Sequence, residues 1–100
     1  FYGAPAAILH CLDDSFPKAR MVDVGIALGY LVLAAHEFGL GTCPIGLIIA
    51  YEDEIKDFLN IPENKNVVIG VALGYPDSNI PINRFKSQRD NLEKFIRWIE

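Results

Sequence analysis

The sequence predicts one small domain that combines helices and strands around a single core. Its 100 residues match the usual length of one domain, and 51% of them are hydrophobic while 22% are charged. Two short apolar runs, Ala6–Leu12 and Val67–Leu73, have the length and composition of buried strands. A longer run of helix-forming residues, 17–38, lies between them. The chain is therefore too apolar for a disordered segment and is expected to pack.

The long helix is expected to begin at Pro17, because a proline in the first turn lacks only an N–H that would be unpaired there. Apolar side chains surround nearly its whole circumference, so it needs cover on more than one side. A domain of this size cannot supply that cover. We expect a second subunit or an N-terminal part of the protein to pack on it. Small residues of the helix, such as Gly25 and Gly29, would let a second helix or a flat ligand approach closely. Alternatively, they simply fit a crowded core.

The remaining elements follow from turn residues and charge. Gly39 and Gly41 are expected to end the helix and open a connecting turn that runs to Gly46. Tyr51–Leu59 reads as a second helix, with carboxylates in its first turn where the helix dipole favours them. Val67–Leu73 is a continuous apolar run, as expected of a central strand covered on both faces. Residues 78–100 are expected to form a surface tail with an apolar end.

Charge, the length of apolar runs and cysteine spacing argue against several classes of protein: nucleic-acid-binding, membrane-spanning and disulfide-bonded. The net charge of −4 and a pI near 5.0 disfavour a nucleic-acid partner. The longest apolar stretch, Val24–Ala35, is 12 residues, shorter than the ~20 that a membrane span needs. Cys11 and Cys43 show no C-x-x-C spacing, which predicts reduced thiols and a cytoplasmic protein. The chain opens at Phe1 with no leader or initiator Met, so we expect a segment of a longer protein or a processed chain.

No side chain is predicted to act as a catalytic group or as a metal ligand. His10 and His36 are the only histidines, and no serine lies in a G-x-S-x-G elbow. Cys43 is better explained as a small buried residue in a turn than as a reactive thiol. His10 and Cys11 are neighbours on a predicted strand, so they point to opposite faces and cannot hold one metal ion.

Two segments could bind a small molecule. The glycines of residues 39–46 follow a helix and do not open one, so they do not form a phosphate-binding loop. Pro44–Leu47 instead offers backbone groups beside a flat apolar surface, which suits the edge of a planar heterocycle, although an ordinary loop would look similar. Residues 82–98 carry five cations against two carboxylates, which suits a small anion such as phosphate or is simply a solvated tail.

A series of short motifs occurs in a fixed order along nearly the whole chain. They are residues 23–27 (DVGIA), 33–46 (LAAHEFGLGTCPIG), 59–62 (LNIP) and 72–77 (ALGYPD), then Asn83, Arg84, Arg89 and Trp98. The series resembles the C-terminal half of an FMN-dependent nitroreductase. The pairs Pro76-Asp77 and Asn83-Arg84 resemble the nitrobenzene and nitrobenzoate reductase branch of that family.

The resemblance implies an α+β fold, a mixed sheet packed against a long central helix in a homodimer core, and an extended C-terminal tail that wraps the partner. Residues 1–100 would be the C-terminal portion of one flavin-binding domain whose N-terminal portion is missing. FMN would lie at the subunit interface against Pro44, Ile45, Gly46 and Leu47, with the Gly46 N–H near flavin N5. Arg89 would pair with the FMN phosphate, helped by Lys86 or Ser87, with Arg84 as a further candidate.

The resemblance also implies the activity. This would be an FMN-dependent NAD(P)H oxidoreductase that reduces nitroaromatic or quinone-like acceptors, small aromatic molecules, in two half-reactions of the ping-pong type. The cofactor does the redox chemistry, so no acid or base side chain is required. The family's Arg-Arg-Ser-x-Arg segment is not in this sequence, and Gly29-Tyr30 replaces a common Gln-Asn pair. The alternatives are a flavin-binding protein without turnover, an assembly fragment, or a related flavin reaction such as reductive dehalogenation.

Overall fold

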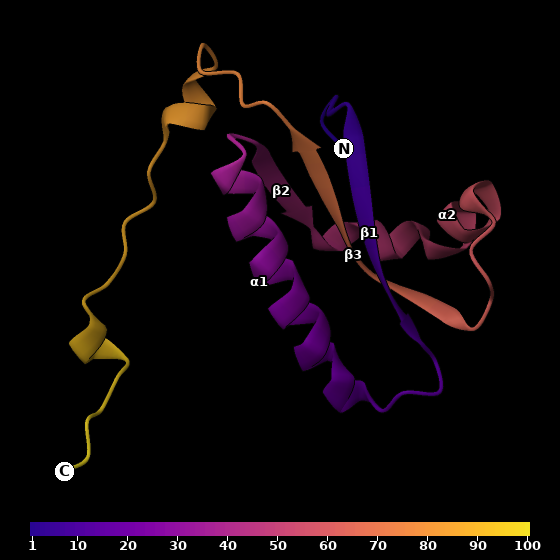
Figure 1. Ribbon diagram of the computed structural model, residues 1–100, viewed down its shortest axis with the longest axis horizontal. Helices are drawn as coiled ribbons and strands as arrows, with labels where there is room; N and C mark the ends of the chain where they lie inside the picture. The colour runs from indigo at the N-terminus through magenta and orange to yellow at the C-terminus, as the bar shows by residue number, and fades with distance from the viewer.

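The computed structural model describes residues 1–100 and contains three strands and two α-helices (Figure 1). The elements in chain order are β1 (Ala6–Asp13), α1 (Met21–Glu37), β2 (Gly41–Ile45), α2 (Glu52–Leu59) and β3 (Lys65–Gly74). A 3₁₀ helix, Gly46–Tyr51, joins β2 to α2. The predicted α+β class is confirmed.

The sheet has the strand order β1-β3-β2, and both neighbouring pairs are antiparallel. The prediction of a mixed sheet is therefore wrong for these residues, because both strands that pair with β3 run opposite to it. The prediction that Val67–Leu73 forms the central strand is confirmed. Val71 is fully buried and Ala72, its neighbour on the opposite face, is 6% exposed. Central strands are covered on both faces, and β3 has the continuous apolar sequence that this requires.

β2 was not predicted, since residues 39–46 were expected to form only a turn. Gly39 does turn the chain, with φ at +72°, and then Gly41–Ile45 pairs with the end of β3. Glycine, cysteine and proline give this segment no alternation of apolar and polar side chains. Pro44 is tolerated because β2 is an edge strand, where a missing N–H costs no ladder bond. Cys43 is exposed on this strand, which corrects the prediction that it is buried in a turn.

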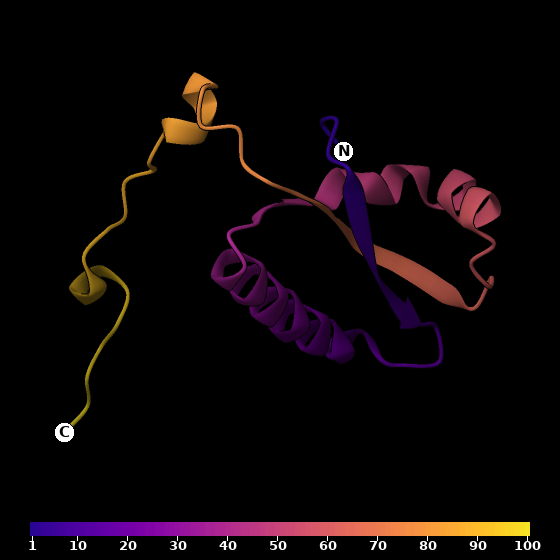
Figure 2. The same cartoon turned by 45° about the horizontal axis from the view of Figure 1, so that its top comes forward.

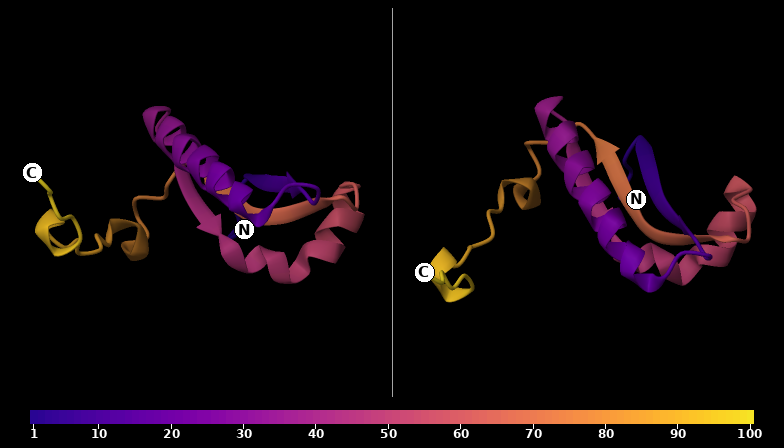
Figure 3. Two further views of the ribbon diagram at one scale, coloured as in Figure 1. Left: turned by 90° about the horizontal axis from the view of Figure 1, so that it is seen from below. Right: turned by 60° about the horizontal axis from the view of Figure 1, so that its bottom comes forward.

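α1 lies on one face of the sheet, and the Gly46–Leu59 segment lies on the other (Figure 3). The helix was predicted from Pro17 to Phe38; a short 3₁₀ turn precedes the α-helix proper, which ends before Gly39 as expected. Only Val24 and Ala35 of the helix are buried, whereas Tyr30 is 72% and Leu33 69% exposed. Most of the apolar circumference of α1 is thus uncovered by this chain.

Judged by length and composition alone, the segment Lys18–Glu37 would be able to cross a membrane, since it has 20 residues and contains an 18-residue window with a mean hydropathy of 1.4. The uninterrupted apolar run within it, Val24–Ala35, is only 12 residues, which is why the sequence predicts no membrane span. In the structure this helix contacts β1 and β2 as a layer of the domain. A helix that is apolar on all sides belongs in the core of a larger protein, so α1 is also explained as a core helix whose other neighbours are not part of this chain.

The C-terminal tail is extended, as predicted, but it leaves the domain and does not cross its surface (Figures 1 and 2). After β3 the chain forms only two short 3₁₀ turns, Pro81–Arg84 and Leu92–Lys94, and runs away from the sheet (Figures 1 and 2). The radius of gyration is 16.6 Å, against about 13 Å for a compact domain of this length. Phe95, Trp98 and Ile99 of the tail are 68%, 81% and 88% exposed. The tail therefore has apolar side chains that nothing in this chain covers.

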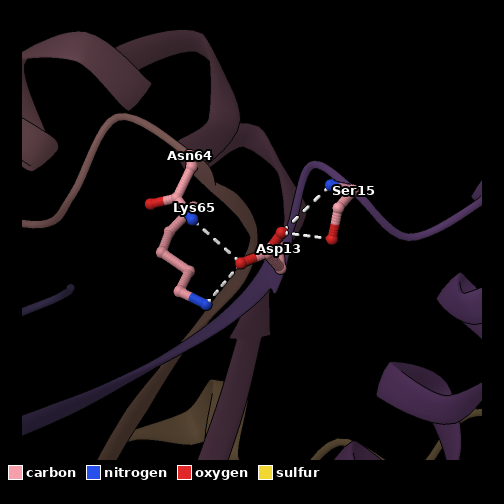
Figure 4. A network of polar contacts seen from close by, with 4 residues as sticks. All are labelled: Asp13, Ser15, Asn64 and Lys65. Carbon is pink, nitrogen blue, oxygen red and sulfur yellow. Dashed lines mark hydrogen bonds and ion pairs between the residues drawn. The ribbon is translucent and has the colours of Figure 1, made fainter.

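A polar network closes the end of the sheet where β1 leads towards α1 (Figure 4). Asp13 accepts hydrogen bonds from Lys65 Nζ at 2.8 Å and Asn64 Nδ2 at 2.9 Å on one carboxylate oxygen. Its other oxygen accepts from the Ser15 hydroxyl at 2.6 Å and the Ser15 N–H at 3.0 Å. These donors, the Lys65 ammonium first, hold the pKa of the Asp13 carboxyl well below its usual range. The network joins β1, β3 and the loop before α1.

We expect Asp13 to make stability depend on pH. Because its folded-state pKa is lowered, the unfolded state binds more protons, so the stabilisation is present above about pH 4 and is lost as the pH falls further. Asp13→Asn in the full-length protein should lower the melting temperature at neutral pH, and the difference from wild type should shrink below pH 4. Asp14→Asn, a change to an exposed neighbour, is the control. A constant difference across pH 2–7 in thermal melts would contradict this role.

A second network ties α2 to β3. β3 carries one extra residue, Val68, at a β-bulge, which interrupts its pairing with β1. Next to the bulge, the Val67 N–H donates to Glu52 Oε1 at 2.8 Å, which lowers the pKa of that carboxyl. Lys56 is 7% exposed, and its ammonium lies 3.1 Å from the same oxygen and donates to the Glu63 carbonyl. α2 and the 3₁₀ helix before it are thereby fixed to the central strand.

Candidate cofactor site

The segment Pro44–Leu47 spans the end of β2 and the start of the 3₁₀ helix. Pro44 and Ile45 are paired with Val71 and Gly70 of β3, so the backbone here is fixed by the sheet. Pro44, Gly46 and Leu47 are nevertheless exposed, and the Leu47 side chain is 76% accessible. Apart from its chain neighbours and the backbone of its own helical turn, no atom lies within 4 Å of the point where a Cβ on Gly46 would sit. The segment is thus rigidly placed and open, as binding a planar ring against it requires.

An apolar hollow of about 310 Å³ lies beside this segment. All six of its lining residues are hydrophobic: Phe1, Ile45, Leu47, Ile48, Tyr51 and Ile55. Phe1, Ile48 and Ile55 also line a second apolar hollow of about 550 Å³, between β1 and α2. Ligand sites are typically concave and mostly apolar with a few polar groups. The side chains present fit the apolar part of a flavin, while the polar contacts would come from the backbone of residues 44–47.

Lys86 and Arg89 lie in the extended part of the tail between its two 3₁₀ turns. Neither takes part in an ion pair or a side-chain hydrogen bond in this structure. By contrast, Lys94 is paired with Asp90 at 2.6 Å, and Arg84 donates to the Asn79 carbonyl at 3.2 Å. The unpaired charges of Lys86 and Arg89 are suited to a phosphate group, because charge-assisted hydrogen bonds to an anion are among the strongest in proteins.

The structure does not bring the two parts of the predicted site together. The tail that carries Lys86 and Arg89 runs away from the sheet that carries Pro44–Leu47 (Figures 1 and 2). A site that used both would need the tail to pack differently or to reach a second chain. The exposed apolar faces of α1 and of the tail offer surfaces for such packing.

Two residues that support Pro44–Leu47 were missed in the sequence. Ile48, 8% exposed, packs over Gly70 of the central strand. A glycine within a β-branched strand often marks the close approach of a neighbour, so Gly70 in the run Val67–Leu73 was the available signal. Nothing in the sequence indicated which residue approaches it.

The remaining candidate groups lie elsewhere. Cys43 lines a hollow of about 370 Å³ at the opposite end of β2, together with residues of the N-terminal segment and of the turn after β3. Burial, and then the nearby Glu52 carboxylate, raise the pKa of the Cys11 thiol, which reduces its thiolate character at neutral pH. No group of three or more His, Cys, Asp and Glu side chains is placed to hold a metal ion.

The fold and the candidate site together define a structural class for this protein. It is an α+β protein with an antiparallel sheet, an open edge segment beside apolar hollows, and a helix and a tail whose apolar side chains are largely exposed. The family follows from sequence comparison. The model of the nitroreductase family matches residues 1–75, and the chain belongs to this family. The resemblance found in the motifs is thereby confirmed.

Individual relatives agree with this assignment. The chain is 32% identical over 99 residues to a 4-nitrobenzoate reductase of Pseudomonas putida, and 31% identical over 99 residues to a chloronitrobenzene nitroreductase of Comamonas testosteroni. Each alignment covers 99% of this chain and 44% of the relative, so the chain spans less than half the length of either protein.

A solved structure shows the same fold. It is the FMN-dependent nitroreductase NfnB from Mycobacterium smegmatis in complex with NADPH, which superposes with a TM-score of 0.93 at 27% identity. The superposition covers 99% of this chain and 44% of NfnB. The long helix and the tail of this chain therefore have counterparts in NfnB.

Proposed function

We propose that this chain is the C-terminal portion of a flavin-binding domain in an FMN-dependent NAD(P)H oxidoreductase that reduces nitroaromatic or quinone-like acceptors. The observation that carries the proposal is the open, sheet-anchored segment Pro44–Leu47 in a chain of the nitroreductase family. Relatives named for the reduction of nitrobenzoate and chloronitrobenzene match along 99% of the chain. The two unpaired cysteines are compatible with a cytoplasmic location.

In this proposal the chain binds and orients, and does not transfer protons. Pro44, Ile45 and Leu47 would present an apolar surface to the flavin ring, and the Gly46 N–H would be the hydrogen-bond donor to its N5 edge. Arg89, with Lys86, holds the phosphate. FMN, when bound, would supply the redox chemistry between NAD(P)H and the aromatic acceptor, in two half-reactions. The absence of a catalytic His, Ser or Cys constellation in the sequence agrees with this division of roles.

The working form is proposed to be a homodimer. α1 would lie in its core, because most of its apolar side chains are uncovered in the single chain. The tail would wrap the partner, which would also carry Lys86 and Arg89 to a site shared between chains. This accounts for a radius of gyration too large for a compact domain of this length.

One experiment separates this function from its alternatives. The full-length protein is purified, its absorption spectrum is recorded, and it is mixed with NADH or NADPH in a stopped-flow instrument before a nitroaromatic or a quinone is added. The proposed enzyme should be yellow, bleach with a reduced nicotinamide cofactor and regain its colour with the acceptor. A yellow protein that is not bleached would be a flavin-binding protein without turnover. A colourless protein that takes up no added FMN would be an assembly module.

A further inference from the structure

We propose that Gly70 of β3 positions the flavin-contact segment Pro44–Leu47 by providing the space in which Ile48 is seated. The inference rests on the proposed function, since it assigns a role towards FMN to a residue that does not belong to the Pro44–Leu47 segment. Gly70 would act through Ile48, so it is a positioning residue.

The space at Gly70 is filled by two neighbouring side chains. A Cβ built on Gly70 would come within 2.7 Å of Ile48 Cδ1 and 3.1 Å of Phe1 Cε1. The backbone of Gly70 does not have the positive φ that would itself favour glycine. Glycine is therefore required here for room and not for conformation. Gly74 is the only other glycine in the chain with contacts this close, where a Cβ would lie 2.8 Å from Pro5 Cδ.

Ile48 is the fixed point on the far side of the proposed flavin contact. It is 8% exposed and is the third residue of the 3₁₀ helix that begins at Gly46. On the near side, Ile45 is paired with Gly70 itself. Gly46 and Leu47 thus lie between Ile45 and Ile48, and both of these residues contact Gly70. A Cβ at position 70 would displace the end of the Ile48 side chain from its seat. The proposal is that this change is passed on to the Gly46–Leu47 backbone, which lies between Ile48 and the paired residue Ile45.

The size of this effect follows from how sensitive bound geometry is to small shifts. Moving a positioning group by about 1 Å can cost up to about 100-fold in rate even when the change lies far from the chemistry, and for FMN affinity we expect a smaller loss of about tenfold. Gly46 has no side chain of its own and no neighbour within 4 Å of its Cβ direction, so no other packing contact of that kind holds it in place. We expect the Gly70 contact to matter more for the flavin than for the rest of the sheet.

The test uses Gly70→Ala in the full-length protein. We expect FMN to bind about tenfold more weakly, a change of ~1.4 kcal/mol, with a shift in the absorption bands of the FMN that does bind. Binding is measured by titration of flavin fluorescence, and stability by thermal melting of the FMN-free protein. The matched control is Gly74→Ala, which creates a similar clash with Pro5 on the same strand and should lower stability while leaving FMN affinity within twofold of wild type.

A second-site change tests the mechanism itself. Ile48→Val removes Cδ1, the atom that a Cβ at position 70 would meet, so it should restore most of the FMN affinity of Gly70→Ala. Should Gly70→Ala not fold, Ile48→Ala removes the anchor without crowding the strand. Because Ile48 also lines the apolar hollow beside Pro44–Leu47, it is compared with Ile55→Ala, a change to another lining residue. Ile48→Ala should weaken FMN binding and alter the flavin spectrum more than Ile55→Ala does; equal effects would overturn the positioning role.

The outcomes separate this inference from the function on which it rests. If the wild-type protein binds no FMN, the proposed function fails and this inference with it. If the wild type binds FMN but Gly70→Ala or Ile48→Ala changes only the melting temperature, the positioning role is overturned while the function stands. A loss of FMN affinity in Gly70→Ala that Ile48→Val restores, with Gly74→Ala unaffected, supports the proposal.

Discussion

Arg89→Ala in the full-length protein should weaken FMN binding by about 10- to 100-fold. The guanidinium has no partner within the chain, so its charge is available to the FMN phosphate. A hydrogen bond to a charged group contributes ~1.5–3 kcal/mol, and each 1.4 kcal/mol is a factor of about ten in affinity. The measurement is a fluorescence titration with FMN at fixed ionic strength.

Two further variants make the Arg89 result specific. Lys94→Ala removes a positive charge of the same tail that is already paired with Asp90, so FMN affinity should change little. Arg89→Lys keeps the charge but loses the planar, two-pronged geometry, and should lie between wild type and Arg89→Ala. Riboflavin, which lacks the phosphate, should bind wild type and Arg89→Ala equally. Undiminished FMN retention by Arg89→Ala would refute the phosphate assignment.

The elements that the sequence predicted are those with a strong pattern of apolar residues. β3 was recognised because Val67–Leu73 is continuously apolar, and α1 because helix formers continue up to Gly39. β2 was missed because its stability comes from backbone pairing with β3. Its side chains, Thr42, Cys43 and Pro44 among them, have no strand pattern. Pairing between distant segments leaves no local signal when the strand is short and at an edge.

The residues of the candidate site also fall into those that the sequence predicted and those that it did not. Pro44–Leu47 was identified from sequence because backbone exposure beside glycine and proline is a local property. Gly70 and Ile48 were not, because their contact joins residues 22 positions apart whose meeting depends on the path of α2. The place of Lys86 and Arg89 relative to Pro44–Leu47 is determined neither by the sequence nor by this chain alone, since the tail has no surface of its own to pack on (Figure 2).

Deletion of the end of the tail is expected to weaken the proposed homodimer strongly. Deleting residues 91–100 keeps Arg89 but removes Phe95, Trp98 and Ile99, which are among the most exposed apolar side chains of the protein. Burying one aromatic side chain of ~150–250 Å² is worth about 4–6 kcal/mol at ~25 cal/mol per Å², before the cost of ordering the tail is subtracted. A homodimer would lose this contribution twice. The truncated protein should therefore dissociate into monomers at concentrations where wild type remains dimeric.

The measurement is molar mass by light scattering over a dilution series. Trp98→Ala should reproduce part of the dissociation, whereas Arg97→Ala, a change to the adjacent exposed charge, should leave the dimer nearly as stable as wild type. An unchanged dimer mass after the deletion would contradict the wrapping tail. Because the deletion retains Arg89, FMN binding adds a second result. If the dimer dissociates and FMN affinity falls with it, the flavin site is shared between chains; if affinity is kept in the monomer, one chain supplies the whole site.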